Sequence, residues 1–289
     1  MKIAIKYVLI YLGLSIVGAV ALLFPTIIVE LALNPELLAA DEFSMSPWTQ
    51  SIMMLGSQLL TLYFFWKKWA DYSFIKESGS KSFFLWAAIG WVGCVLIATF
   101  IQTYAPQWDW DMGILKEIGD MSRNPLGIIS ICVMAPLLEE GIFRGTIERK
   151  LLEKNRNPWC AIVISALAFA IVHGNLTQGI IALILGLFMG WIYYRTRNIW
   201  LCIFVHALNN TVSVVGTWAT GDVSGVSPFS LPVDLLLLAV GIGLVIIFAL
   251  QYKKLPIFVP QPEDKVVEGL PVQPEGLPAE VPEQQEPME

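Results

Sequence analysis

The sequence predicts an all-α fold, a polytopic membrane helical bundle with about eight transmembrane helices. Of the 289 residues, 56% are hydrophobic and only 15% are charged, which is too apolar for a soluble globular domain. The apolar residues form long continuous runs, and a bilayer core about 30 Å thick needs roughly 20 such residues per helix. A membrane β-barrel would instead need short strands of alternating polarity.

The apolar runs give eight candidate helices. In chain order they span 7–29, 47–66, 82–104, 125–143, 158–173, 178–194, 199–219 and 233–252. The first run follows Lys2 and Lys6 and contains an Ala-Val-Ala sequence, as a secretory signal peptide does. Because this run continues to Val29, we expect an uncleaved anchor helix.

Lysine and arginine residues give the orientation of these helices. They occur at every second connection, at 2–6, 67–81, 149–156, 195–197 and 253–254. The connections between these contain none at 30–50 and 220–232, and two among four acidic residues at 105–124. Basic residues concentrate on the cytoplasmic side of a membrane. Both termini are therefore predicted to be cytoplasmic, and the membrane is predicted to be a bacterial cytoplasmic membrane.

Residues 255–289 differ in composition from the rest of the chain. They contain eight prolines, eight acidic residues and one lysine, and they repeat the sequence EGLP. Such a segment cannot bury a core and is expected to be disordered, partly as polyproline II, with a docking segment as the alternative. The remaining residues are close to neutral and contain no large basic patch, which argues against a nucleic-acid partner.

Ionisable side chains lie inside three of the predicted helices. Such groups are costly within a membrane and usually face a cavity or a partner. One buried histidine alone would more often be a packed core residue, but here both histidines of the chain are involved. The set comprises Glu139, Glu140 and Arg144 on the fourth helix, His173 on the fifth, and His206 and Asn210 on the seventh.

The spacing of the charged residues separates the two glutamates. Glu140 precedes Arg144 by four residues, which is the favourable order for a helical ion pair. Glu139 is rotated about 100° from Glu140 around the helix. Arg144 can therefore neutralise Glu140 and leave Glu139 facing another direction.

The histidines show the same spacing. Phe169 lies four residues before His173, so its ring can pack beneath the imidazole, and His206 shares a helix face with Asn210. Small residues are expected to let helices approach closely around such a site. These are Gly141, Gly145, Gly174, Gly186 and Gly190.

These residue types support hydrolysis. A carboxylate with a histidine can hold and deprotonate a water molecule, and a histidine with an asparagine amide can donate to a developing oxyanion. A carboxylate and two histidines also match the ligands of a catalytic zinc site. The HExxH arrangement is absent from the sequence. The residues alone do not decide between a metal-free and a zinc-bound water, and no cofactor is certain.

Three motifs occur in order, namely EExxxR (139–144), FxxxH (169–173) and HxxxN (206–210). Together they resemble the CAAX-protease and bacteriocin-processing (CPBP/Abi) family of intramembrane endopeptidases, which includes the type II CAAX prenyl endopeptidases. The resemblance covers about residues 85–220. It implies a protease core over these residues. The apolar runs and the composition add N-terminal transmembrane helices with a cytoplasmic loop (1–84), a last transmembrane helix (221–254) and a disordered cytoplasmic tail (255–289).

The resemblance also implies a role for each motif residue. Glu139 would be the catalytic base, acting on a water molecule together with His173. His206 and Asn210 would stabilise the tetrahedral intermediate. The supporting residues would be Glu140, Arg144 and Phe169. A metal-free glutamate mechanism is favoured, and a metal-dependent one would place zinc on Glu139, His173 and His206.

The predicted activity is cleavage of a peptide bond in a membrane-associated or lipid-modified peptide or protein, within a cavity open to the cytoplasm. Prenylated ends, peptide precursors, bacteriocins and membrane regulators are candidate substrates. One alternative is a non-catalytic scaffold, or a bacteriocin-immunity or regulatory protein that retains the fold. The other is a transporter with an intramembrane polar relay, which would predict internal repeats that the sequence does not convincingly show.

Residue counting gives conflicting depths for the site. It places Glu139 near the cytoplasmic end of its helix, whereas His173 falls near the outer end of the next helix. Either residues 145–158 enter the membrane region, or the 158–194 hairpin is short and tilted around a water-filled cavity. Irregular backbone at such depth requires hydrogen-bond partners from protein or water.

Overall fold

The computed structural model describes residues 1–38, 45–73, 81–105, 109–154 and 157–254, so the predicted disordered tail lies outside the described residues. Within these ranges every regular element is helical, which confirms the all-α prediction. Six helices are long and apolar enough to cross a membrane. They are Lys2–Leu33 (α1), Lys81–Tyr104 (α3), Pro125–Lys154 (α5 to α7), Leu176–Thr196 (α9), Ile199–Thr220 (α10) and Leu231–Lys253 (α11).

The other two predicted helices also form but are less suited to crossing a membrane alone. Helix α8, Pro158–Val172, has 15 residues. Helix α2, Pro47–Lys68, is long enough but buries polar side chains, including Gln58 and Thr61. Of the eight predicted helices, six thus correspond to described helices that could span a membrane by length and composition, and two to α2 and α8. A further helix, α4 (Asp109–Met121), forms in the segment predicted as an acidic outer loop.

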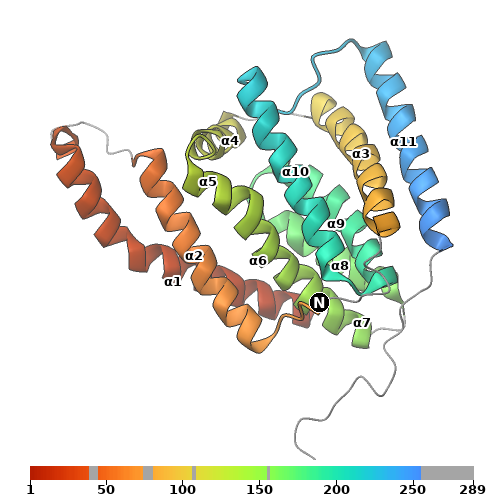
Figure 1. Ribbon diagram of the computed structural model, residues 1–289, viewed down its shortest axis with the longest axis horizontal. Helices are drawn as coiled ribbons and strands as arrows, with labels where there is room; N and C mark the ends of the chain where they lie inside the picture. Colours follow the sequence, from red (N-terminus) through yellow and green to blue (C-terminus); the bar gives the residue numbers. More distant parts are fainter. Residues whose placement is uncertain (39–44, 74–80, 106–108, 155–156, 255–289) are drawn as a thin grey trace, which may run out of the picture. The chain divides into compact units, whose positions relative to one another are not determined.

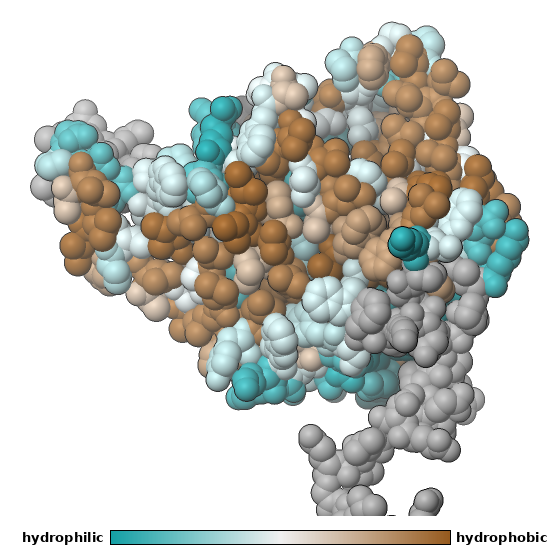
Figure 2. All heavy atoms as spheres, in the orientation of Figure 1, coloured by the Kyte–Doolittle hydropathy of each residue, from teal (hydrophilic) through white to brown (hydrophobic). Residues whose placement is uncertain are grey.

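The chain forms an integral membrane bundle with the site near its centre. Helix α1 packs along α2, and α3 packs along α11 (Figure 1). Helices α5 to α7, α8, α9 and α10 form the centre. Hydrophobic side chains cover the middle of the face seen in Figure 2, and hydrophilic ones gather toward the helix ends. This distribution is the one expected where lipid surrounds the middle of the helices.

Asparagine side chains fix where four consecutive central helices begin. Each carboxamide oxygen accepts a hydrogen bond of 2.8–3.1 Å from a backbone N–H in the first turn. The capping residues are Asn124, Asn157, Asn175 and Asn198. A proline follows the first two, where its missing N–H costs nothing. The sequence therefore places these helix starts locally.

The helix that carries the two glutamates is longer than predicted. It was expected to end at residue 143, but it continues to Lys154. Glu139 is 14 residues from Pro125 and 15 from Lys154, or about 21–22 Å from either end at 1.5 Å per residue. The placement of Glu139 near the cytoplasmic end is therefore wrong. The structure has the first of the two alternatives, in which residues beyond 145 continue into the bundle.

Two π-helical segments interrupt this long helix. They span Ser130–Met134 and Phe143–Glu148, on either side of α6 (Ala135–Ile142), which carries both glutamates. Neighbouring helices bond to backbone carbonyls of the first segment. Gln58 Nε2 donates to Ser130 O at 3.3 Å, and Asn210 Nδ2 donates to Ile131 O at 2.8 Å. Protein groups thus satisfy this irregular backbone, as burial in a membrane protein requires.

Candidate active site

Glu140 and Arg144 form the predicted ion pair. Both side chains are fully buried, and Arg144 Nη1 lies 2.9 Å from Glu140 Oε1. Arg144 Nη2 also donates to the backbone oxygen of Gly186 at 3.1 Å, and the guanidinium carbon lies 4.7 Å from the Phe169 ring centroid. The arginine side chain therefore contacts residues of α6, α8 and α9.

Glu140 has a second partner that the sequence analysis did not predict. His206 Nδ1 lies 2.8 Å from Glu140 Oε1. Because an ionised carboxylate only accepts hydrogen bonds, Nδ1 carries the proton. This contact fixes the imidazole so that Nε2 points toward Glu139, at 3.9 Å from its Oε2. Glu140 therefore orients His206 as well as neutralising Arg144.

Glu139 has a different environment from its neighbour. Its side chain is 17% exposed, whereas that of Glu140 is fully buried. It lines the central cavity, and Glu139 Oε2 has no hydrogen-bond partner among the described residues. The predicted separation of the two carboxylates is confirmed, with Glu140 paired and Glu139 facing open space.

Phe169 joins the two histidines. Its ring centroid lies 4.9 Å from that of His173 and 5.6 Å from that of His206, both in edge-to-face geometry. The predicted packing of Phe169 beneath His173 is confirmed. His173 Nδ1 lies 2.7 Å from Phe169 O, and a carbonyl oxygen only accepts, so Nδ1 carries the proton. Nε2 of a neutral His173 is then available as an acceptor or base.

Four of the five glycines lie where another part of the chain packs closely against the helix backbone, as predicted. A Cβ at Gly141 would overlap the hydroxyl of Tyr72, which donates to Leu137 O at 2.9 Å. Burial and the charge of Glu140 raise the pKa of this Tyr72 phenol. The other three glycines with such close neighbours are Gly145, Gly186 and Gly190. The prediction is wrong for Gly174, whose Cβ would meet no described atom within 4 Å; its φ of +72° instead ends α8 directly after His173.

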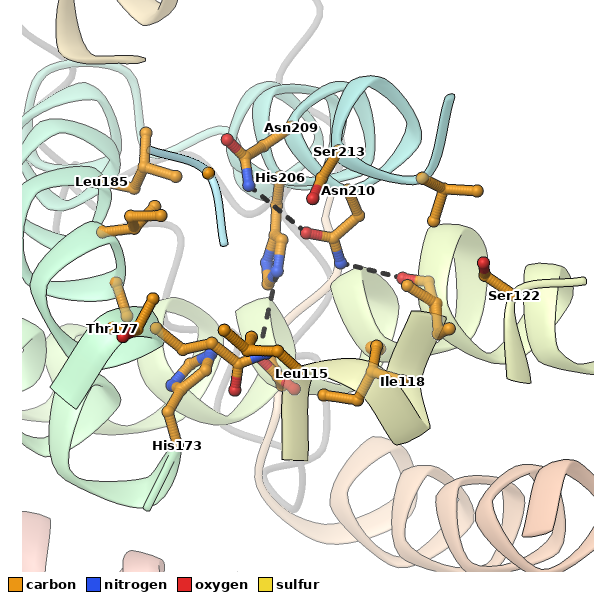
Figure 3. A pocket seen from close by; sticks show the side chains of 18 of the residues that line it. Leu115, Ile118, Ser122, His173, Thr177, Leu185, His206, Asn209, Asn210 and Ser213 are labelled. Atoms are coloured by element: carbon orange, nitrogen blue, oxygen red, sulfur yellow. Dashed lines mark hydrogen bonds and ion pairs between the residues drawn. The ribbon is translucent and has the colours of Figure 1, made fainter. Parts of the chain in front are cut away.

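Asn210 lines the cavity and also forms a hydrogen bond to the helix that carries the glutamates. One of its amide N–H groups donates to Ile131 O, so only the second is free for a substrate. Its Oδ1 accepts from Asn209 at 3.5 Å, and Trp91 Nε1 donates to Asn209 Oδ1 at 3.3 Å. Figure 3 shows His206 and Asn210 projecting from α10 into the same space. Asn209 thus links Asn210 to Trp91 of α3 through side-chain hydrogen bonds.

A cavity of about 340 Å³ brings the predicted catalytic residues together. Its lining includes Glu139 and Phe169. It also includes His173, His206 and Asn210, which are labelled in Figure 3. From these the lining continues to residues farther along the bundle, namely Ile118, Gly119, Ser122, Thr217, Val223 and Gly225. Those lie at the helix ends opposite to the lysine- and arginine-rich connections. The predicted opening to the cytoplasm and the predicted orientation therefore do not agree, because the cavity reaches the end of the bundle away from the basic connections.

The side chains that could bind a metal lie farther apart than those that form hydrogen bonds in the site. Among the residues that the structure describes, no three His, Cys, Asp or Glu side chains converge enough to hold an ion. Zinc bound by Glu139, His173 and His206 stays a prediction from the sequence. It would require these side chains to move closer together than they are here.

Two residues near the site were missed. Glu148 is fully buried, and within the described part of the chain neither of its carboxylate oxygens has a hydrogen-bond partner. Its i,i+4 spacing from Arg144 could have indicated it. Tyr11 of α1 also lines the cavity, with its ring edge-on to Phe143 at 6.4 Å. No local pattern relates α1 to the motifs, so Tyr11 could not be predicted from the sequence.

Comparison with known proteins covers this same part of the chain. Residues 122–212, which contain all three motifs, match the family model described as "Type II CAAX prenyl endopeptidase Rce1-like". The "Putative membrane peptidase YdiL" of Bacillus subtilis (strain 168) is 34% identical over 139 residues, which are 45% of this chain. The match spans 55% of that protein, so about half of its length is represented. No solved structure matches the chain. The resemblance inferred from the motifs is thus confirmed, since residues 122–212 are similar to the Rce1-like type II CAAX prenyl endopeptidases.

Proposed function

We propose that the chain is an intramembrane endopeptidase that hydrolyses a peptide bond of a membrane-associated or lipid-modified peptide or protein. The observation that carries the proposal is the unequal environment of two adjacent carboxylates. Glu140 is held by Arg144 and His206, whereas Glu139 faces the cavity. The names of the matched family and relative, an endopeptidase and a membrane peptidase, support the same reaction class.

Glu139 is the proposed base. A water molecule between its carboxylate and Nε2 of His173 can be deprotonated as its oxygen attacks the carbonyl carbon of the substrate. The Nδ1 proton of His173 is held by Phe169 O, so Nε2 keeps its lone pair for that water. The proton taken up by Glu139 then passes to the leaving nitrogen as the C–N bond breaks. The products are a carboxylate and an amine.

His206 and Asn210 are the proposed donors to the tetrahedral intermediate. As an imidazolium, His206 would donate from Nε2, while the Glu140 carboxylate holds Nδ1. The free N–H of Asn210 would be a second donor. Preorganised donors of this kind typically contribute about 10²–10³-fold in rate each. Glu140, Arg144 and Phe169 act through these groups by fixing their positions.

The proposed setting is a bacterial cytoplasmic membrane, with both termini in the cytoplasm, as the lysine and arginine pattern predicts. A prenylated CAAX end, the substrate class in the family's name, is one candidate substrate. Peptide precursors and membrane regulators are others.

Cleavage of a panel of membrane-associated peptides by the purified chain in detergent tests the proposal. Glu139→Gln keeps the shape of the side chain and removes the base, so we expect a loss of about 10²–10⁴-fold in kcat. Glu153→Gln is the matched control, because Glu153 lies on the same long helix with an exposed side chain. A chelator is added in parallel, and retained activity would support a metal-free water.

Two results would count against an enzyme. If Glu139→Gln and His206→Ala both cleave like the wild type, the cavity carboxylate is not the base. If no peptide is cut and both variants also match the wild type in a cellular assay of the protein's effect, the non-catalytic scaffold or immunity function takes its place.

A further inference from the structure

The structure separates the bundle into two chemically different ends. At one end, lysine- and arginine-rich connections are tied together: Arg149 Nη2 donates to Trp69 O at 3.0 Å, and Arg195 Nη2 donates to Tyr252 O at 3.2 Å. At the other end, Trp218 Nε1 donates to Ser122 Oγ at 3.1 Å. The charge alternation seen in the sequence therefore corresponds to two real ends of one bundle. By the positive-inside rule, the first of these ends is cytoplasmic.

The cavity changes from buried to exposed along its length. Near the middle of the bundle, its lining includes Met189, Phe169 and His206, which are exposed by 0%, 2% and 5%. Farther along α10, Ser213 is exposed, and Gly225 beyond the helix is exposed as well. The closed floor is thus at mid-bundle, and the open rim lies away from the basic end.

Three elements form this rim. Leu115 and Ile118 of α4 line the cavity. Gly119 of the same helix lies so close to the next connection that a Cβ there would be 3.0 Å from Val223. The Trp218–Ser122 hydrogen bond ties the end of α4 to α10. Helix α4, α10 and residues 223–225 therefore surround one entrance.

We infer that substrate enters the cavity from the non-cytoplasmic side of the membrane, between α4 and α10. The substrate class is then an extended segment of an exported or membrane-inserted protein, presented from that side. The substrate part of this inference rests on the proposed endopeptidase function, whereas the position of the entrance does not.

The cavity favours a short unfolded segment over a folded domain. Its volume of about 340 Å³ is near the lower end of small-ligand sites. Its outer walls mix apolar side chains, such as Ile118 and Val223, with polar ones, such as Ser213 and Thr217. Apolar walls can accept side chains of an uncharged segment, while polar groups can bond to its backbone.

Single-cysteine labelling in intact bacterial spheroplasts tests the entrance. The four native cysteines are first replaced by alanine, and accumulation of the full chain is checked. Ser213→Cys then probes the rim. Ser230→Cys probes an exposed position at the same end, and Ser73→Cys probes an exposed position at the basic end. All three are small, matched substitutions, and the probe is a membrane-impermeant sulfonated maleimide.

We expect Ser213→Cys and Ser230→Cys to be labelled in intact spheroplasts, and Ser73→Cys only after permeabilisation. If Ser73→Cys is labelled in intact spheroplasts and the other two are not, the entrance is cytoplasmic and the inference is overturned. If Ser230→Cys reacts but Ser213→Cys does not react even after permeabilisation, the rim faces lipid and an aqueous entrance is overturned. Labelling does not depend on catalysis, so it can succeed even if the chain cleaves nothing.

Discussion

Replacing Arg144 by methionine tests whether the buried ion pair organises the site. Methionine keeps most of the length and volume of the side chain but removes its charge and hydrogen bonds. The variant leaves Glu140 fully buried with His206 as its one remaining described partner. It also removes the bond to Gly186 O and the charge over the Phe169 ring.

The expected cost is large because a charge is left buried without its partner. Removing one member of a buried pair typically costs about 3–5 kcal/mol. With about 2–4 °C per kcal/mol, the scale for soluble chains of 150–250 residues, this corresponds to roughly 6–20 °C in Tm. Glu140→Gln should cost a similar amount, since it leaves Arg144 unpaired. The double variant should fall short of the sum by about 2–3 kcal/mol.

Thermal unfolding in one detergent, followed for the single and double variants, measures this coupling. The control cycle uses Arg149→Met and Glu153→Gln, an i,i+4 pair on the same helix with side chains 25% and 56% exposed. Exposed pairs are worth at most about 1 kcal/mol. The reasoning is refuted if Arg144→Met unfolds within 2 °C of the wild type, or if the two core substitutions are additive.

Other predictions use the same long helix. Glu148→Gln replaces a buried carboxyl group without described hydrogen bonds by an uncharged amide of the same shape. Tm should stay equal or rise, and cleavage should change less than about tenfold. A loss of Tm as large as that of Glu140→Gln would contradict this. Gly141→Ala places a Cβ on the Tyr72 hydroxyl and should cost about 1–3 kcal/mol in thermal unfolding. The control is Gly13→Ala on α1, where a Cβ would meet no described atom within 4 Å. This substitution should stabilise the fold by about 0.5–1 kcal/mol. If both glycine substitutions change the stability equally, close packing at Gly141 does not explain the effect of Gly141→Ala.

The sequence predicted most of the helical architecture because its signals are local. Apolar runs and asparagine–proline starts act within a few residues, and the i,i+4 pair of Glu140 and Arg144 follows from helix geometry alone. The packing of Phe169 on His173 could be predicted for the same reason. The separation of Glu139 from Glu140 follows from a rotation of about 100° per residue.

The rest depends on contacts between helices, which local patterns do not encode. The His206–Glu140 bond joins residues 66 positions apart, and Tyr11 reaches the cavity from a helix outside the motifs. The helix end at residue 143 was mispredicted because Arg144, Glu148 and Arg149 resemble a polar helix end. Arg144 and Glu148 are in fact buried in the fold, where contacts with other side chains replace contacts with water.

The π-helical segments have a consequence for insertions and deletions. A π turn closes its hydrogen bonds from i to i+5, so it accommodates one more residue than an α turn at the same place. Deleting one residue within Ser130–Met134 would close this stretch into regular α-helix and leave the residues before it facing nearly as they do now. A deletion in the regular helix between this stretch and Glu139 would instead rotate them by about 100°, and the capping Asn124 would leave its position beside Pro47 and Ser51. The π-helical stretch is therefore the place where relatives one residue shorter should keep both halves of the helix facing the cavity.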